Sequence, residues 1–219
     1  MISYEELRRD EAISTYIRHA DETLAALGYT EHSFAHVTHV AETAASILTQ
    51  LGHNEKTVEL ARIAGYLHDI GNLVNRVGHS QSGAIMVFRM LEHRSMEPED
   101  IALIVSAIGN HDEGTGVPIN AVSAALILAD KGDVRRSRVR NRDFATFDIH
   151  DRVNYSVTDA EYAINEMKTE ITLSLRIDTA ISPIMDYFEI FLDRMILCRK
   201  AAEVLGLQFR LQINEQQLF

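Results

Sequence analysis

The chain has 219 residues and a formal net charge of −11, with 46% apolar and 24% charged residues. This composition is ordinary for a globular protein, and the length is sufficient for one large domain or for a core domain with a smaller addition. The acidic balance argues against the broad basic surface that a long nucleic acid needs. We therefore expect a globular protein that binds no long nucleic acid.

The chain lacks the patterns of export and membrane insertion, which predicts a cytoplasmic protein without a membrane partner. Its first nine residues include acids where a secretion signal needs an apolar core. No later stretch approaches the ~20 apolar residues of a membrane span. The single cysteine, Cys198, has no partner for an internal disulfide and lies in an apolar helical pattern, so we expect a buried, inert thiol.

Apolar residues at helical spacing predict a bundle of five or six helices in the first two thirds of the chain. The expected helices cover residues 4–27, 33–51, 54–69, 79–93, 98–108 and about 119–131. Gly28 and Gly52 end the first two, and Pro98 with two following acids is a favourable helix start. Short connections between helices are typical of a compact helical bundle, which we assign to residues 1–142.

The pattern changes after Asp143, where alternating apolar and polar residues predict strands at 153–157, 171–177 and 207–213. A long apolar helix is expected from about 182 to 205 between the last two strands. We therefore predict a small α+β appendage over residues 143–219, with a three-stranded antiparallel sheet and one helix packed on it. Because so small a sheet has exposed edges, we expect it to pack against the bundle or against a second subunit in a homodimer.

Histidines and aspartates recur at the ends of the expected helices. Each has an ordinary explanation as a helix cap or a solvated side chain. Together they lie in or beside apolar runs, where burying an unpaired polar group is costly. Imidazole and carboxylate donors suit Fe, Mn, Co, Ni or Zn better than a lone Mg. The candidate metal ligands are His36, His68, Asp69, His79, His111 and Asp130.

Helical periodicity separates His36 from its neighbours. His36 shares a face with Val40 and Ala44, whereas His39 lines up with polar residues and is expected at the surface. His32, one turn earlier, is a candidate for capping or for facing a substrate. Asp130 follows an apolar helix whose C-terminus disfavours negative charge, so that either Lys131 or a metal must compensate it.

Basic residues concentrate just beyond Asp130, where six of them accompany one acid between Lys131 and Arg142. Such a patch in an acidic protein favours a small anionic ligand. We expect Lys131, Arg135 and Arg136 to hold phosphate, and the three later arginines, 138, 140 and 142, to lie in a solvated loop or subunit contact. Asn72 is expected to orient a ligand or substrate, and Asp133 to position Lys131 or an arginine.

The ordered set His36, His68-Asp69 and Asp130 resembles the HD-domain metal-dependent phosphohydrolases, over about residues 30–142. His79 and His111 match the extended pattern H…HD…H…H…D. In this family-like arrangement Asp69 bridges two ions, His36, His68 and Asp130 hold the first, and His79 and His111 hold the second. The resemblance thus implies a divalent transition metal cofactor, with two ions and with Fe or Mn favoured over Ni, Co or Zn.

This resemblance implies hydrolysis of a phosphate ester or anhydride in a small, nucleotide-like substrate by a metal-activated hydroxide. The implied catalytic residues are Asp69 and Lys131, and the implied substrate-binding residues are His32, Asn72, Lys131, Arg135 and Arg136. The extended pattern is similar both to symmetrical dinucleoside tetraphosphatases and to mixed-valent di-iron oxygenases. An oxygenase, a nucleotide sensor without turnover and a metal-free core therefore remain alternatives. Residues 110–118 resemble the signature of cyclic-dinucleotide phosphodiesterases, but Asp112 and Val117 depart from it.

Overall fold

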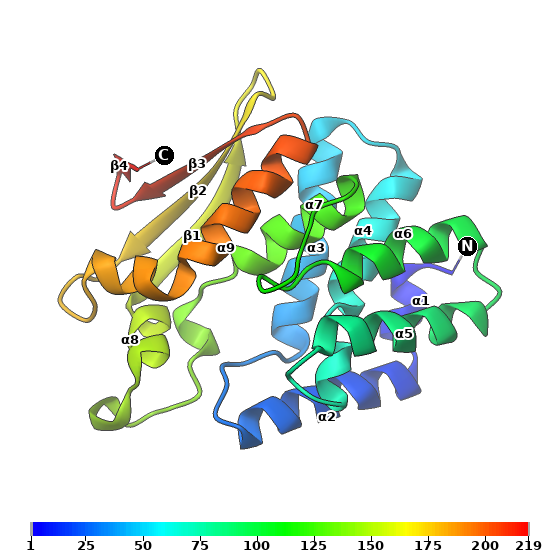
Figure 1. Ribbon diagram of the computed structural model, residues 1–219, viewed down its shortest axis with the longest axis horizontal. Helices are drawn as coiled ribbons and strands as arrows, with labels where there is room; N and C mark the ends of the chain where they lie inside the picture. The colour runs from blue at the N-terminus through cyan, green and yellow to red at the C-terminus, as the bar shows by residue number, and fades with distance from the viewer. Residues whose placement is uncertain (1, 219) are drawn as a thin grey trace.

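A bundle of helices with a small sheet at one side makes up the computed structural model, which describes residues 2–218 (Figure 1). The bundle contains α1 (Tyr4–Arg8), α2 (Glu11–Ala26), α3 (Phe34–Leu51), α4 (Glu55–Leu67), α5 (His79–Glu92), α6 (Pro98–Gly109) and α7 (Ala121–Lys131). Short 3-10 turns, η1 (Ile70–Leu73), η2 (Arg136–Arg138) and η3 (Phe144–Thr146), lie in the connections. The predicted mainly helical fold with a small C-terminal α+β appendage is confirmed.

The helix expected over residues 4–27 is wrong in one respect, because it is divided into α1 and α2. The carboxylate of Asp10 accepts hydrogen bonds from the N–H groups of Ala12 and Ile13 and so caps the start of α2. Ser3 and Glu6 form a capping box at the start of α1. The two capping residues, Ser3 and Asp10, are seven residues apart, which favours two helices over one.

Helices α3 and α4 pack at the centre of the bundle, and Gly65 permits their close approach. A Cβ atom at Gly65 would lie 2.7 Å from Cα of Ala41, a distance that no side chain tolerates. The surrounding core contains fully buried residues such as Val40, Leu60 and Ile104. This packing fixes the end of α4 relative to the start of α3, where the candidate ligands lie.

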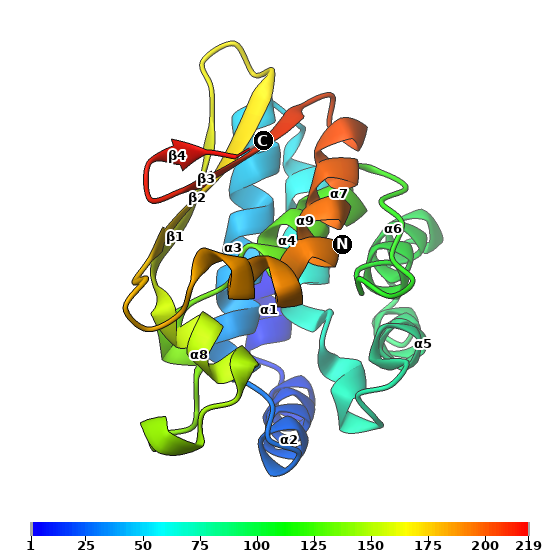
Figure 2. The same ribbon diagram turned by 60° about the vertical axis from the view of Figure 1, so that its left-hand side comes forward.

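The C-terminal part contains α8 (Ile149–Ser156), β1 (Val157–Ile164), β2 (Glu170–Ile177), α9 (Ile184–Val204), β3 (Gln208–Ile213) and β4 (Gln216–Gln217). The strands form one sheet in the order β1-β2-β3-β4, and Figure 2 shows α9 lying over one of its faces. The predicted three-stranded antiparallel sheet is corrected in detail. The described residues form four strands, and β2 and β3 are parallel because α9 carries the chain back across the sheet before β3 begins.

The strand expected at 153–157 is also wrong, since all but its last residue belong to α8. Val153 and Val157 are four residues apart and both are buried, so that the spacing fits a helix face as well as a strand. Asp148 decides for the helix, because its side chain accepts a hydrogen bond from the N–H of Asp151. Strand β1 follows α8. Its sequence did not predict a strand, because its exposed side carries polar residues such as Asp159 and Glu161.

A second apolar cluster joins the appendage to the bundle. Side chains of β2 and α9, among them Leu173 and Phe191, pack with Leu128 of α7 and Ile47 of α3. The sheet thus covers its apolar face against the bundle, one of the two arrangements expected. Cys198 is buried within this cluster. Among residues 2–218, no helix combines the length and apolar character required to cross a bilayer.

Candidate metal centre

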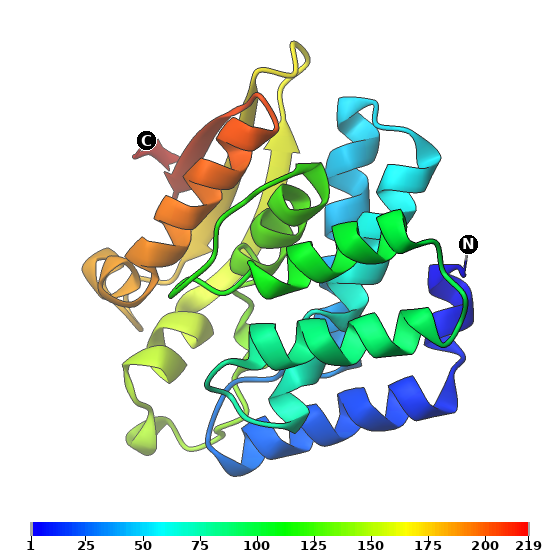
Figure 3. The same ribbon diagram turned by 45° about the vertical axis from the view of Figure 1, so that its right-hand side comes forward.

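The ends of five helices converge on one point and bring the predicted ligands together (Figure 3). His36 lies in the first turn of α3, His68 and Asp69 follow α4, and His79 begins α5. His111 follows α6 by two residues, and Asp130 lies in the last turn of α7. Five of these six residues are buried, and the sixth, Asp130, has a side chain that is 12% exposed.

Gly71 places the start of α5 against the end of α4. A Cβ atom at Gly71 would lie 1.9 Å from the carbonyl oxygen of His79 and 2.5 Å from the backbone nitrogen of Gly83. Any side chain would therefore push α5 away from η1. The glycine two residues after Asp69 is thus what allows His79 to lie beside it.

Four donor atoms form a first cluster around His68. Its Nε2 lies 3.3 Å from Nε2 of His36, 3.1 Å from Oδ2 of Asp69 and 3.6 Å from Oδ1 of Asp130. Nε2 of His36 lies 3.5 Å and 3.4 Å from the same two carboxylate oxygens. Ligands bound at ~2.1 Å from one transition metal are ~3.0–3.5 Å from each other in octahedral or tetrahedral geometry. The cluster has the dimensions of a metal site.

A second cluster faces the other oxygen of Asp69. Oδ1 of Asp69 lies 3.5 Å from Nε2 of His79 and 4.0 Å from Nε2 of His111. The two histidine nitrogens are 3.2 Å apart. Asp69 thus directs Oδ2 to one set of donors and Oδ1 to another, which is the arrangement of a bridging carboxylate.

Hydrogen bonds fix the tautomer of all four histidines. Nδ1 of His68, His79 and His111 lies 2.6–3.0 Å from the backbone carbonyl oxygens of Gly65, Arg76 and Ile108, respectively. Because a carbonyl oxygen only accepts, each Nδ1 carries a proton, and the neutral form of each ring presents the Nε2 lone pair to the centre. Nδ1 of His36 makes the equivalent bond to Oδ2 of Asp133 at 2.7 Å. Such bonds are typical of metal-binding histidines, since they orient the ring.

The electrostatics of the cluster favour a cation. Burial raises the pKa of Asp69 and of Asp130, but His68, His36 and, for Asp130, Lys131 outweigh it and hold both pKa values well below the ordinary range. Burial lowers the pKa of His68, and the two carboxylates outweigh it and raise that pKa to about 10. The centre therefore attracts positive charge strongly. The Nε2 atoms converge on the same point, and a divalent metal ion there would take the place of the proton on His68, so that this charge balance fits one or two such ions.

Two further predicted residues border the centre. Asn72 donates from Nδ2 to Oδ1 of Asp69 at 2.9 Å and so orients the bridging carboxylate. His32 bonds through Nδ1 to the carbonyl oxygen of Thr30, and its Nε2 lies 4.0 Å from Oδ2 of Asp69. Burial and the neighbouring guanidinium of Arg138 lower the pKa of His32 well below its usual value, so that a neutral imidazole faces the centre.

Lys131 is buried in a chain of alternating charges. Its Nζ lies 2.7 Å from Oδ2 of Asp130 and 2.5 Å from Oε2 of Glu113. Arg194 of α9 donates from Nε to Oε1 of the same glutamate at 2.8 Å. Burial raises the pKa of Glu113, but Lys131 and Arg194 outweigh it and hold that pKa well below the usual range. Lys131 therefore holds Asp130 in place. Its ammonium group contacts two carboxylates of the protein, those of Asp130 and Glu113.

A cavity of about 340 Å³ opens beside the centre, and only one of the three expected cations lines it. Its lining includes the expected Lys131 together with Arg76, Arg138 and Arg194. Arg135 and Arg136 are not brought to it, because Arg135 pairs with Asp133 and Arg136 stacks on Tyr155 and bonds to its carbonyl oxygen. The expectation that Arg138 lies in a solvated loop is wrong, since its side chain is 5% exposed.

Sequence reasoning missed three of these contributions for identifiable reasons. Arg76 lies three residues before His79, a spacing that indicates proximity only once the turn between η1 and α5 is known. Arg194 comes from a helix far along the chain. Asp133 was expected to position Lys131 or an arginine; it pairs with Arg135 and Arg138 and also orients His36.

Comparisons with known proteins agree with this geometry. The sequence model of the HD domain matches residues 33–153. The chain is also similar to the uncharacterized protein MJ1020 of Methanocaldococcus jannaschii, with 27% identity over 160 residues. This similarity covers 63% of this chain and 61% of that protein, so that the chain spans less than two thirds of its relative's length.

Proposed function

The chain belongs to the HD domain family, and from this premise we propose that it hydrolyses a phosphate ester or anhydride of a small, nucleotide-like substrate. Membership places it in a superfamily of metal-dependent hydrolases. The donor set and the histidine tautomers support metal binding by this chain in particular. We further propose two bound ions, with Fe or Mn favoured by the family resemblance among the metals that imidazole and carboxylate donors suit.

One observation supports the proposal most directly. The two oxygens of Asp69 face separate donor sets, with Oδ2 3.1 Å from Nε2 of His68 and Oδ1 3.5 Å from Nε2 of His79. In the proposed site, His36, His68, Asp69 and Asp130 hold one ion, and Asp69, His79 and His111 hold the other. Divalent ions bound there supply Lewis acidity, which activates water and neutralises charge on a phosphoryl group.

Two arginines are placed to hold the phosphoryl group. Arg76 has no carboxylate within ion-pair distance among residues 2–218, and its Nη1 lies 3.5 Å from Nε2 of His79. Arg138 also lines the cavity and uses Nε and Nη1 on the carbonyl oxygens of Glu31 and Asp133, beside the Asp133 carboxylate. A guanidinium beside a metal centre binds a phosphate oxygen and orients the ester for attack, and Arg76 does so without a competing counter-ion.

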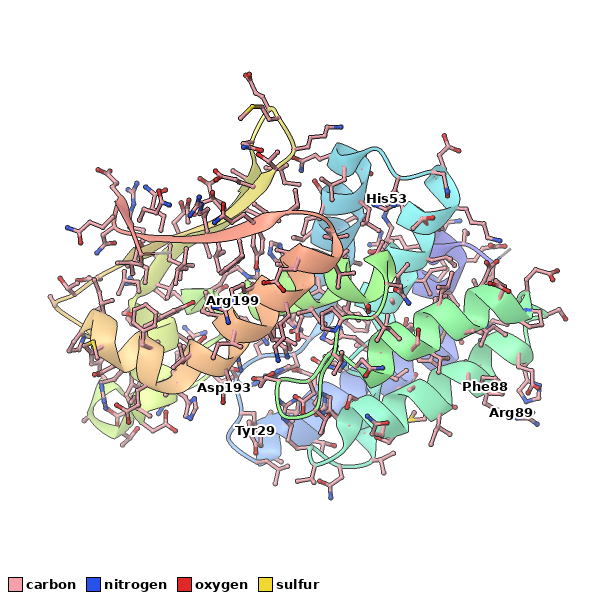
Figure 4. The ribbon with its side chains drawn as sticks, turned by 45° about the horizontal axis from the view of Figure 1, so that its top comes forward. Tyr29, His53, Phe88, Arg89, Asp193 and Arg199 are labelled. Carbon is pink, nitrogen blue, oxygen red and sulfur yellow. The ribbon has the colours of Figure 1, made fainter. Side chains whose placement is uncertain are left out.

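Phosphate release from a panel of nucleotides and other phosphoesters tests this function. The protein is reloaded with Mn(II) or, without oxygen, with Fe(II), and its metal content is measured beside the rate. We expect turnover in the wild type and loss of turnover in Asp69→Asn, with a His53→Ala control unchanged. His53 is exposed (Figure 4) and follows the C-terminus of α3, whereas His36 lies in the first turn of that helix.

The outcomes separate the alternatives. Fewer than about one tightly bound transition metal per chain after reloading would defeat the metal site itself. Oxygen consumption by a reduced two-iron protein, without phosphate release from any ester, would identify an oxygenase instead. Nucleotide binding without turnover in a fully metal-loaded protein would identify a sensor.

We also propose a cytoplasmic location and a homodimer formed through the appendage. The sheet supports the dimer because β1 lies at its edge and pairs only with β2 among the described strands. An unpaired strand edge is a site for addition of a second chain. Light scattering tests the dimer, and a monomeric mass would remove it.

A further inference from the structure

The cavity beside the metal centre extends beyond the ligands to the appendage. Its lining includes Asp148, which caps the start of α8, Asp151 and Asn154 within α8, and Phe191 from α9. In Figures 1 and 3 the loop after α2 runs between α8 on the left and the start of α5 on the right. The metal ligands Asp69 and His79 line the same cavity, so a ligand held at the metal end can extend to the residues of α8.

The two walls have opposite charge. The lysine and arginine residues of the lining are Arg76, Lys131, Arg138 and Arg194, and of these Arg76 and Lys131 lie beside the metal ligands His79 and Asp130. On the α8 side, neither Asp148 nor Asp151 forms an ion pair with any described residue, although both line the same cavity. Uncompensated carboxylates repel a phosphate and attract hydrogen-bond donors.

The acceptor atoms on α8 are only partly used. Asp148 accepts one bond, from the N–H of Asp151 at 2.8 Å, and Asp151 accepts one, from Nδ2 of Asn141 at 3.1 Å. Asn154 is 7% exposed and donates from Nδ2 to the carbonyl oxygen of His150 at 2.8 Å. Its Oδ1 has no partner within residues 2–218. One wall thus presents the amide oxygen of Asn154, the half-buried carboxylate of Asp151 and the exposed carboxylate of Asp148, each with an oxygen that accepts from no described residue.

We propose that the cavity selects a phosphate compound with hydrogen-bond donors, hydroxyl or ammonium groups, at the end remote from the phosphate, and that Asp148, Asp151 and Asn154 bind those donors. The inference rests on the proposed function, which sets the phosphate at the metal end. Asn154 is buried and Asp151 is half-buried, so leaving their acceptor atoms unmatched costs affinity, and a phosphate without donors binds more weakly. The appendage then serves specificity as well as packing.

Matched ligands test the proposal. Turnover by the Mn(II)-loaded protein is compared for ribose 5-phosphate, O-phosphoethanolamine and phenyl phosphate, which differ in the donor they carry. Binding of the corresponding non-hydrolysable phosphonates is measured by calorimetry, so that affinity is known whether or not turnover occurs. The variant is Asp148→Asn with Asp151→Asn, because asparagine keeps the helix cap and removes only the charge. Asp193→Asn, on the exposed face of α9, is the control.

We expect the donor-bearing compounds to bind about 10- to 100-fold more tightly than the phenyl compound, the range of a lost charged hydrogen bond. The double variant should lose most of this preference and keep its affinity for the phenyl compound. A preference for the ribose compound assigns hydroxyl donors, and one for the ethanolamine compound assigns an ammonium donor. Turnover without any preference, or a preference that survives in the double variant, overturns the inference and leaves the hydrolase intact. Preferential phosphonate binding without turnover supports the inference and overturns the hydrolase.

Discussion

Arg194 and Glu113 join the appendage to the metal centre through a hydrogen bond of 2.8 Å between Nε and Oε1. The other oxygen of Glu113 contacts Lys131, which in turn contacts Oδ2 of Asp130. Charge alternates along this chain, so that each group stabilises the next. Oδ2 of Asp130 is thereby occupied, and Oδ1 is left to face Nε2 of His36 at 3.4 Å.

Replacing Arg194 should weaken the centre from a distance. In Arg194→Ala, Glu113 keeps Lys131 as its cationic partner but loses the bond that fixes its own position. Lys131, and through it Asp130, is then less firmly positioned. We expect metal affinity and kcat to fall about 10-fold each, the size of a lost charge-assisted hydrogen bond. Arg194→Lys should recover part of both. Metal dissociation constants and steady-state rates, measured on the same preparations, check this expectation.

The control is Arg199→Ala, on the same helix and exposed to solvent (Figure 4). It removes the same charge without touching Glu113. Equal losses in the Arg194 and Arg199 variants would show that charge alone is responsible. Unchanged metal affinity in Arg194→Ala would contradict the link to Asp130.

Asp133 should control metal affinity through His36. Its Oδ2 lies 2.7 Å from Nδ1 of His36, and loss of such a bond typically costs 10- to 100-fold in metal affinity. We expect this loss in Asp133→Ala and a smaller one in Asp133→Asn, whose amide oxygen still accepts from Nδ1. Competition with a metal-binding dye measures both constants. Equal affinity in the alanine variant and the wild type would exclude the role.

Sequence patterns predicted the elements whose signals are local. The helix starts at Ser33 and Asn54 are set by caps that lie next to the apolar pattern they open. The pair His68-Asp69 follows the apolar helix α4 directly. Its separation in sequence from the other candidate ligands did not prevent their prediction, because the ends of helices meet in a bundle. The resemblance to the HD domain family is confirmed by the match over residues 33–153.

The remaining features depend on contacts between distant segments. Arg135 and Arg136 follow Asp130 closely, yet the chain turns at Gly132 and carries both away from the cavity. Arg138 returns to it, since its backbone and side chain both bond to Glu31, more than 100 residues earlier. No local pattern distinguishes these three arginines. The catalytic and substrate-binding roles stay predictions.

Removing the second donor set should lower the metal content to one ion. His79 and His111 contact only Oδ1 of Asp69 among its two oxygens. We therefore expect the double variant His79→Ala with His111→Ala to bind about one ion per chain where the wild type binds about two. Elemental analysis after dialysis counts the ions. A wild type with one ion, lost entirely in the double variant, would place the single ion at His79 and His111 instead.

Gly71 should be intolerant of any side chain for reasons of space. A Cβ atom there would overlap the carbonyl oxygen of His79, so that Gly71→Ala must move α5 relative to η1. We expect a loss of about 2–4 kcal/mol in the free energy of unfolding, in the range of severe core substitutions. Urea unfolding measures the loss, together with metal content as a report on His79.

Gly28→Ala is the control that distinguishes the steric cost of a side chain from the cost of a left-handed backbone. Gly28 has a φ of 83° and no atom within 4 Å of the added Cβ, so its substitution costs only the left-handed backbone, about 1 kcal/mol. Similar losses at both glycines would contradict the steric explanation for Gly71.

The buried thiol of Cys198 should make stability fall at alkaline pH. Burial raises the pKa of Cys198 to about 12, above the ~8.5 of an unfolded chain. The unfolded state therefore loses its proton first, and the stability present below about pH 8.5 is lost by up to ~1.4 kcal/mol per pH unit as the pH rises towards the folded pKa. Cys198→Ala lacks this contribution, while Tyr162 and Tyr187 titrate in both proteins. The difference between wild type and variant in the free energy of unfolding should thus shrink by about 2–3 kcal/mol between pH 8 and pH 10.5. Urea titrations at several pH values measure that difference, and a constant difference would show that the thiol is not held neutral by burial.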